Sequence, residues 1–196
     1  STQSRSSAAS DVYKRQVIDS FPQDAKIIFG PDYNLGNYIN SVTGRNMLLW
    51  NGGCHVHEKF SVEAIIKLKQ EHPEAVVMAH LECKAPVLAV ADVKGSTATM
   101  LHYAQEHPEI KEYIIATEAG ILHELERNCP DVIFYPVPPE VSEGGVGCSC
   151  NECEYMKMNS LKKIYNSLKF GWPTVEVAPE IAKDAVKPIE KMLSLS

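Results

Sequence analysis

Three cysteines near the C-terminal end of the sequence are the strongest local indication of chemistry. Cys148, Cys150 and Cys153 lie within six residues, and neighbouring thiolates suit a soft metal ion or an iron–sulfur centre. Cys150 and Cys153 also form a Cys-x-x-Cys pair, a spacing found in redox-active dithiols. A four-cysteine zinc ribbon would need a second Cys-x-x-Cys, and the sequence contains none. The Cys148–Cys153 loop therefore predicts either an iron–sulfur ligand or a non-catalytic module that binds zinc or responds to thiol oxidation.

A fourth candidate thiol, Cys54, follows two glycines. Gly52 and Gly53 allow the backbone to approach a ligand closely, and His57, three residues after the cysteine, can face the same site. Taken alone, a Cys-x-x-His pattern is more typical of a small buried cysteine at a strand end and a histidine at the surface. Residue types and spacing leave both interpretations open.

His80 and Glu82 follow a short apolar stretch that reads as a strand. An imidazole and a carboxylate at a strand end suit acid–base work or substrate binding, and the carboxylate can hold the histidine tautomer or raise its basicity. A solvated pair on a surface loop explains the same two residues.

Ser96 and Thr97 stand at the expected start of a helix, directly after Gly95. Unpaired N–H groups and two hydroxyls at such a position form a natural site for a phosphate or a carboxylate. Ser96 acting only as a helix N-cap accounts for the same residues, and a cap and an anion site can coincide.

Alternating elements must position these residues. Short apolar, often β-branched stretches predict strands at residues 26–29, 47–50, 75–79, 113–116 and 132–135. Helical spacing predicts helices at about residues 61–70, 96–105, 120–127, 158–168 and 179–193, with Ser61 as one N-cap. This alternation indicates an α/β fold with a parallel sheet covered on both faces. Because function gathers at the carboxyl ends of parallel strands, the loops that carry Cys54, His80 and Cys153 are expected to converge.

Bulk composition restricts the class of protein. The chain has 196 residues, 44% of them hydrophobic, and a formal net charge of -6, so it can bury a core and lacks the excess positive charge of a nucleic-acid or membrane-surface binder. No apolar run approaches the length of a membrane span, and the first residues do not resemble a secretory signal. We expect a cytoplasmic protein with neither a nucleic-acid nor a membrane partner.

Several segments, in their order along the chain, resemble quinolinate synthase. The match spans residues 17–193, and the set is far more specific than any one of its members. The segments are Pro31-Asp32 with Leu35-Gly36, Trp50 to His57, His80 to Glu82, Gly95-Ser96-Thr97, Thr117-Glu118 with Gly120, and Cys153 followed by Met156-Lys157-Met158-Asn159.

This resemblance implies an enzyme of de novo NAD biosynthesis that uses a [4Fe–4S] cluster to condense iminoaspartate with dihydroxyacetone phosphate, releasing quinolinate, phosphate and water. An aspartate oxidase or dehydrogenase would act upstream. Three αβα domains with short parallel sheets, in a pseudo-threefold arrangement, would each supply one cysteine to the cluster. Cys54 and Cys153 would be two ligands, and one iron would remain free to act as a Lewis acid.

The resemblance also implies roles for the side chains around the cluster. Glu82, His80 and His57 would be catalytic, with Glu82 in acid–base steps and His80 also in contact with substrate. Ser96 and Thr97 would hold the substrate phosphate or a carboxylate. Leu81 stands where the family usually has proline, and we expect it to loosen the turn between His80 and Glu82.

The resemblance further suggests how the chain divides. Residues 1–16 are expected to be adapter-derived or disordered, 17–55 the C-terminal half of the second αβα domain, 56–140 the third αβα domain, and 141–196 the cysteine loop and C-terminal helices. The first domain and its cysteine, the third cluster ligand, are expected to be missing. We therefore expect a fragment that is inactive alone and does not hold a stable cluster.

Overall fold

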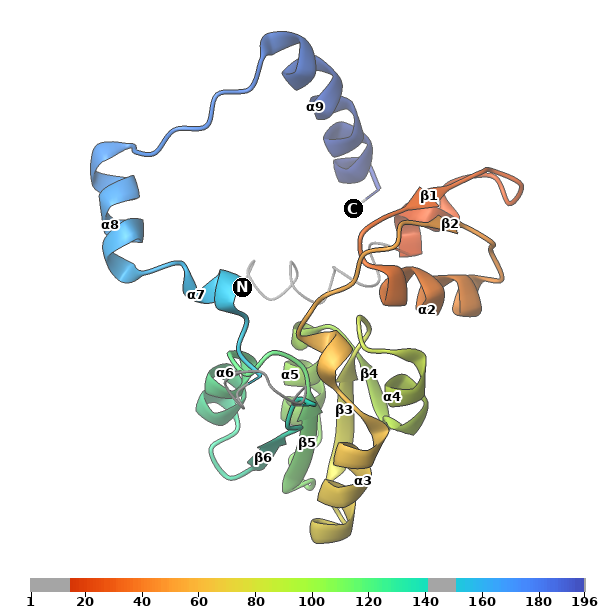
Figure 1. The fold of residues 1–196 in the computed structure, drawn as a ribbon, viewed down its shortest axis with the longest axis vertical. Coiled ribbons are helices and arrows are strands. Elements are labelled where there is room, and N and C mark those ends of the chain that lie inside the picture. The colour runs from red at the N-terminus through yellow and green to blue at the C-terminus, as the bar shows by residue number, and fades with distance from the viewer. Residues whose placement is uncertain (1–14, 141–150, 196) are drawn as a thin grey trace.

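The computed structural model describes residues 15–140 and 151–195 (Figure 1). The strands are β1 (Ile28–Phe29), β2 (Leu48–Leu49), β3 (Val76–His80), β4 (Val93–Gly95), β5 (Glu112–Ala116) and β6 (Ile133–Pro136). The helices are α2 (Tyr33–Thr43), α3 (Val62–Glu71), α4 (Ala85–Val90), α5 (Thr97–Glu106), α6 (Ile121–Asn128), α7 (Glu154–Lys157), α8 (Leu161–Phe170) and α9 (Pro179–Leu193), with a 3-10 turn η1 (His57–Lys59). Residues 15–19 are also helical.

The strands form two parallel sheets. β1 pairs with β2, and the larger sheet has the order β4-β3-β5-β6. In the larger sheet Val76 is in register with Tyr113, and Glu112 with Ile133. Because every strand of this sheet is parallel to its neighbour, all four carboxyl ends lie along one edge.

Helices cover both faces of the larger sheet. Val77 and Ala79 of β3 belong to one apolar cluster, which includes Ile65 of α3 and Leu88 of α4. Met78, which lies between them, belongs to a second cluster with residues of α5 and α6. Alternate residues of a strand point to opposite faces, so β3 is buried on both sides. The predicted α/β class, with three-layer αβα packing around a short parallel sheet, is confirmed.

The smaller sheet packs against α2 and is joined to the larger one by side-chain contacts. Leu35 and Ile39 of α2 form a third apolar cluster with Ile18, Met47 and Leu81. Leu81 comes from the turn after β3 and is only 4% exposed. Its side chain anchors the turn in the core of the smaller unit, and the expectation that Leu81 loosens the turn relative to proline stays a prediction.

Serine N-caps begin three of the helices. The hydroxyls of Ser61, Ser96 and Ser160 each accept a hydrogen bond from the backbone N–H three residues further on, at the starts of α3, α5 and α8. Such caps satisfy N–H groups that the first helical turn leaves without partners. The predicted start at Ser61 is confirmed. The helix expected at 158–168 begins at Leu161 and is preceded by the separate short helix α7.

From α7 the chain continues through α8 and α9 as an open arc (Figure 1). α7, α8 and α9 contain no buried residue, and large apolar side chains such as Leu161 and Leu168 are more than 80% exposed. Among the described residues, no helix combines the length and apolarity needed to cross a bilayer.

Candidate active site

A pocket of about 500 Å³ lies at the carboxyl edge of the larger sheet. Six residues singled out by the sequence line it, and they come from the segment after β2, the end of β3 and the turn after it, the first position of α5 and the N-cap of α7. The six are Cys54, His57, His80, Glu82, Thr97 and Cys153. Ser96 is not in the wall, because it is buried and its hydroxyl contacts the backbone N–H and the hydroxyl of Thr99.

The loop that carries Cys54 is held by Asp32. One carboxylate oxygen of Asp32 accepts the N–H of Leu35 at 3.0 Å and so caps α2. The other oxygen accepts the N–H of Cys54 at 2.7 Å. Asp32 is 5% exposed, so one buried carboxylate both starts α2 and positions the cysteine.

Cys54, His57 and Glu82 form a compact trio. The cysteine sulfur, a ring nitrogen of the histidine and a carboxylate oxygen all lie within 4.8 Å of one another. His57 Nδ1 is 3.3 Å from Glu82 Oε2, and its Nε2 is 3.0 Å from the Thr117 hydroxyl. His57 is 5% exposed, so the interpretation of this residue as a surface histidine is wrong.

Contacts within the trio shift the pKa values of Cys54 and His57. The hydrogen bond from His57 lowers the pKa of the Cys54 thiol against the opposing effect of burial. Burial lowers the pKa of His57, but the hydrogen bonds and charges of Cys54 and Glu82 outweigh it and raise that pKa to about 9. In the metal-free protein the site therefore favours an imidazolium between two anionic groups.

His80 stacks on His57. The ring centroids are 4.5 Å apart and the ring planes differ by 17°. His80 Nδ1 accepts the backbone N–H of Glu82 at 3.3 Å, which assigns the proton of a neutral ring to Nε2. The turn after β3 thus presents His80 and Glu82 together to the pocket.

Cys153 is held at the pocket by a second carboxylate, that of Glu118. Glu118, in the loop after β5, accepts the backbone N–H of Cys153 at 3.2 Å and that of Gly120 at 2.7 Å. Asn151 is buried; its carbonyl accepts the N–H of Ala119, and its side-chain amide donates to the carbonyl of Val137. These bonds fix residues 151–153 against the ends of β5 and β6.

The remaining described thiols take no part in the pocket. Cys83 is fully buried, its sulfur lies 3.4 Å from the carbonyl oxygen of Ala116, and burial raises its pKa to about 12. Cys129 is packed in the second apolar cluster. Cys148 and Cys150 lie outside the described residues, so the alternative module built on the Cys148–Cys153 loop stays a prediction.

The donor set at the pocket fits a thiolate-bound iron–sulfur centre. Cys54 and Cys153 line the same pocket from opposite parts of the chain, and thiolates are the protein ligands such clusters use. Within residues 15–140 and 151–195 these are the two cysteines that face it.

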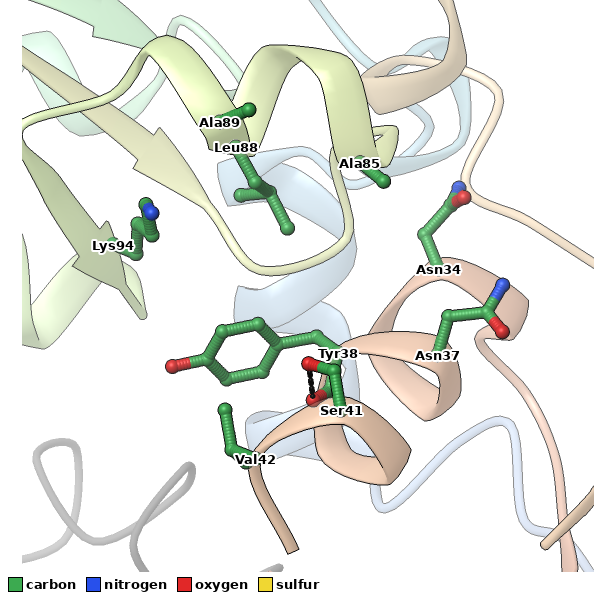
Figure 2. A pocket seen from close by; sticks show the side chains of 9 residues that line it. All are labelled: Asn34, Asn37, Tyr38, Ser41, Val42, Ala85, Leu88, Ala89 and Lys94. Atoms are coloured by element: carbon green, nitrogen blue, oxygen red, sulfur yellow. Dashed lines mark hydrogen bonds between the residues drawn. The ribbon is translucent and has the colours of Figure 1, made fainter. Parts of the chain in front are cut away.

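A separate pocket of about 360 Å³ lies between α2 and α4. Figure 2 shows the ring of Tyr38 reaching from α2 toward Lys94 on β4, with Asn34 and Asn37 on the α2 side and Leu88 on the α4 side. None of the candidate site residues lines it, and its groups offer neither a thiol nor a carboxylate.

Asp32, Thr117, Glu118 and Asn151 support the site, yet the sequence indicated a supporting role for none of them. Asp32, Thr117 and Glu118 stand inside the segments that resemble quinolinate synthase, and Thr117 and Glu118 also directly follow the strand predicted at residues 113–116. No pattern around Asn151 indicates its bonds to Ala119 and Val137.

Comparison with known proteins agrees with the resemblance. Residues 6–194 match the family model described as quinolinate synthetase A protein. The chain is 42% identical over 181 residues to quinolinate synthase of Nostoc punctiforme (strain ATCC 29133 / PCC 73102), and 44% identical over 181 residues to that of Trichodesmium erythraeum (strain IMS101). Each alignment covers 92% of this chain and 54% of the relative, so the chain spans about half the length of the curated relatives it matches. The chain belongs to the quinolinate synthetase A family.

Proposed function

We propose that this chain forms part of a quinolinate synthase that condenses iminoaspartate with dihydroxyacetone phosphate to quinolinate, phosphate and water. One observation carries the proposal: Cys54, His57, His80, Glu82, Thr97 and Cys153 line a single pocket. The proposed setting is cytoplasmic de novo NAD biosynthesis. An aspartate oxidase or dehydrogenase would supply the iminoaspartate.

Cys54 and Cys153 would hold a [4Fe–4S] cluster together with a third cysteine from elsewhere in the complete enzyme. When bound, the cluster supplies a Lewis-acidic iron. The backbone N–H of each cysteine is tied to a carboxylate, Asp32 or Glu118, so both thiols are positioned before the cluster binds.

Glu82 would move protons. Its Oε2 lies 3.3 Å from Nδ1 of His57, so the carboxylate can take a proton from substrate while the His57 ring stabilises its charge. His80 lines the pocket beside it and would contact substrate.

Thr97 would meet the substrate phosphate or a carboxylate. It is the first residue of α5 and lines the pocket, where the N–H groups and dipole of the helix favour an anion. Ser96 is engaged as the N-cap of α5, so we assign Ser96 the task of shaping the anion site and Thr97 the direct contact.

A chimera tests the proposal. Residues 15–196 are joined to the part of the Nostoc punctiforme relative that this chain does not span, and the protein is purified and assayed without oxygen. We expect about four irons per chain and quinolinate formation. Cys54→Ser and Cys153→Ser should each lower iron and turnover together, whereas Glu82→Gln should keep the iron and lose at least about 100-fold in turnover.

The matched control is Cys129→Ser, a thiol remote from the pocket, which should keep its iron. The 196-residue chain assayed alone should form no quinolinate. Full iron in both Cys54→Ser and Cys153→Ser, or undiminished turnover in Glu82→Gln, would overturn the proposal. Stoichiometric zinc without iron in the chimera would favour a zinc module instead.

A further inference from the structure

We propose that Cys54, His57 and Glu82 form a binding site for a single Zn²⁺ ion in the cluster-free protein. The site shares Cys54 with the proposed cluster, but it needs only residues of this chain. The zinc site can therefore be tested independently of the proposed synthase activity.

Distances in the trio fit tetrahedral zinc. Zinc binds histidine nitrogen and carboxylate oxygen at about 2.0–2.1 Å, so two such ligands on a tetrahedral ion are about 3.3 Å apart. His57 Nδ1 and Glu82 Oε2 are separated by 3.3 Å. The Cys54 sulfur, one ring nitrogen of His57 and one carboxylate oxygen of Glu82 all lie within 4.8 Å of one another, and rotation of these side chains would bring them onto one ion.

The orientation of His57 is that of a metal ligand. Its Nε2 contacts the Thr117 hydroxyl at 3.0 Å; when Zn²⁺ displaces the proton from Nδ1, Nε2–H donates to this hydroxyl and the Nδ1 lone pair faces the ion. Nδ1 is buried and faces Glu82 Oε2 at 3.3 Å, so it is the ring nitrogen that an ion held by Glu82 would meet. Histidines that bind metals commonly donate their second ring N–H to such a partner, so Thr117 fixes the tautomer that presents Nδ1 to the ion.

Charge at the pocket favours a dication. A thiolate and a carboxylate together neutralise Zn²⁺, and His57 adds a third donor once the ion has displaced the proton that its ring carries in the metal-free protein. The described wall contains Glu82, Glu118 and Glu124, with no lysine or arginine. The trio faces the pocket, which leaves the fourth coordination position of the ion accessible to water or a small ligand.

Sharing of Cys54 makes the two metal centres mutually exclusive. Zn²⁺ held by the Cys54 thiolate occupies a cluster ligand, so zinc bound to the cluster-free protein has to leave before an iron–sulfur cluster can assemble. The structure thus indicates a point at which zinc competes with cluster loading.

Metal titration of the 196-residue chain tests the site. The chain is freed of metal with a chelator under reducing conditions and titrated with Zn²⁺ by calorimetry, and in parallel with Co²⁺ as a spectroscopic substitute. We expect one ion per chain, visible absorption of tetrahedral Co²⁺, and a thiolate-to-metal charge-transfer band that Cys54→Ser removes. Thr117→Val, which removes only the outer partner of His57, should weaken zinc binding by about 10–100-fold.

Two variants separate this inference from the proposed function. Cys153→Ser removes a proposed cluster ligand that lies outside the trio, so it should bind zinc like the parent chain while losing iron in the chimera. Glu82→Gln should do the reverse, with weakened zinc binding and retained iron. Circular dichroism confirms that each variant is folded. Absence of stoichiometric binding by the parent chain, or equal losses in Cys153→Ser and Cys54→Ser, would overturn the zinc site.

Discussion

The carboxylate of Asp32 accepts a hydrogen bond from the backbone N–H of Cys54 over 2.7 Å. Its second oxygen caps α2 through Leu35. The bond therefore couples the start of a helix to the position of a candidate metal ligand, and the side chain that makes it is buried.

Removal of this carboxylate should destabilise the chain. Asp32→Ala leaves two N–H groups without their acceptor, and the combined loss of a cap and a part-buried hydrogen bond should cost about 2–4 kcal/mol. Asp32→Asn keeps one acceptor oxygen and should cost about half as much. Urea unfolding followed by circular dichroism measures both. The control is Ser160→Ala, which removes the cap of the exposed helix α8 and should lower the free energy of unfolding by about 1 kcal/mol or less. If Asp32→Ala lowered it by no more than Ser160→Ala, Asp32 would not both cap α2 and hold Cys54.

Glu118 should protect two backbone amides. It accepts the N–H groups of Cys153 and Gly120, and loss of a bond worth about 1 kcal/mol corresponds to about fivefold faster amide exchange. We expect this acceleration at both residues in Glu118→Ala, measured by hydrogen–deuterium exchange. The amide of Ala119 serves as an internal reference, because its acceptor is the carbonyl of Asn151. Unchanged exchange at Cys153 would show that Glu118 does not hold it.

The thiols should differ in reactivity because thiolates, not thiols, are alkylated. His57 lowers the pKa of Cys54, whereas burial raises the pKa of Cys83 to about 12 and also raises that of Cys129. In the folded metal-free chain at neutral pH, iodoacetamide should label Cys54 well before Cys83 and Cys129. His57→Asn should slow labelling of Cys54 and leave the other sites unchanged. Mass spectrometry of the digested chain gives each rate, and labelling of Cys83 as fast as Cys54 would refute the ranking.

The shift at Cys83 also predicts a loss of stability in alkali. The pKa of Cys83 is near its ordinary value of about 8.5 when the chain is unfolded and about 12 when it is folded. A raised pKa stabilises the folded state fully below the unfolded value, and this contribution falls as the pH rises toward the folded value. Unfolding free energy should therefore decline between about pH 9 and pH 12, and less so in Cys83→Ala. If the unfolding free energy fell equally with pH in the parent chain and in Cys83→Ala, the loss could not be assigned to Cys83.

Gly30 should not tolerate a side chain. A Cβ on Gly30 would clash with the Cβ of Trp50, and the Trp50 Cβ cannot move without its backbone. Gly30→Ala should destabilise the chain by about 1–3 kcal/mol. The comparison is Gly44→Ala, where the left-handed φ of 68° causes strain although nothing lies within 4 Å. Asparagine tolerates a left-handed φ, so Gly44→Asn should be more stable than Gly44→Ala, whereas Gly30→Asn should be no more stable than Gly30→Ala. A free energy of unfolding that Gly30→Ala leaves unchanged would disprove the clash.

Local rules predicted the elements that carry strong local signals. Ser61 and Ser96 are N-caps whose hydroxyls meet the N–H three residues on, and β3 and β5 are apolar runs long enough to recognise. Helix α2 was missed because Gly36 and several polar residues obscure its apolar spacing, while Asp32, its cap, gave a weak signal alone. Strand β4 was missed because three residues provide too short a pattern; its place depends on pairing with β3.

Contacts distant in sequence explain the rest of the site. Burial of His57 depends on Thr117, 60 residues away, and on Glu82, so a Cys-x-x-His pattern could not distinguish a buried ligand from a surface residue. The burial of Leu81 depends in the same way on a cluster formed with α2. Residue order indicated which loops converge, but only packing between the two sheets shows which side chains meet.

Because the four strands of the larger sheet run in the same direction, the edge at their amino ends and the edge at their carboxyl ends should differ in how well they tolerate inserted residues. The turns at 72–75 and 107–111 enter β3 and β5 from the edge opposite the pocket, and residues added there lengthen a surface turn. One residue added within β3 or β5 would instead reverse which face each later side chain meets, and would displace His80 or Thr117 from the pocket. A linker, tag or binding peptide can therefore be inserted at one edge of this sheet, whereas the other edge demands a fixed chain length.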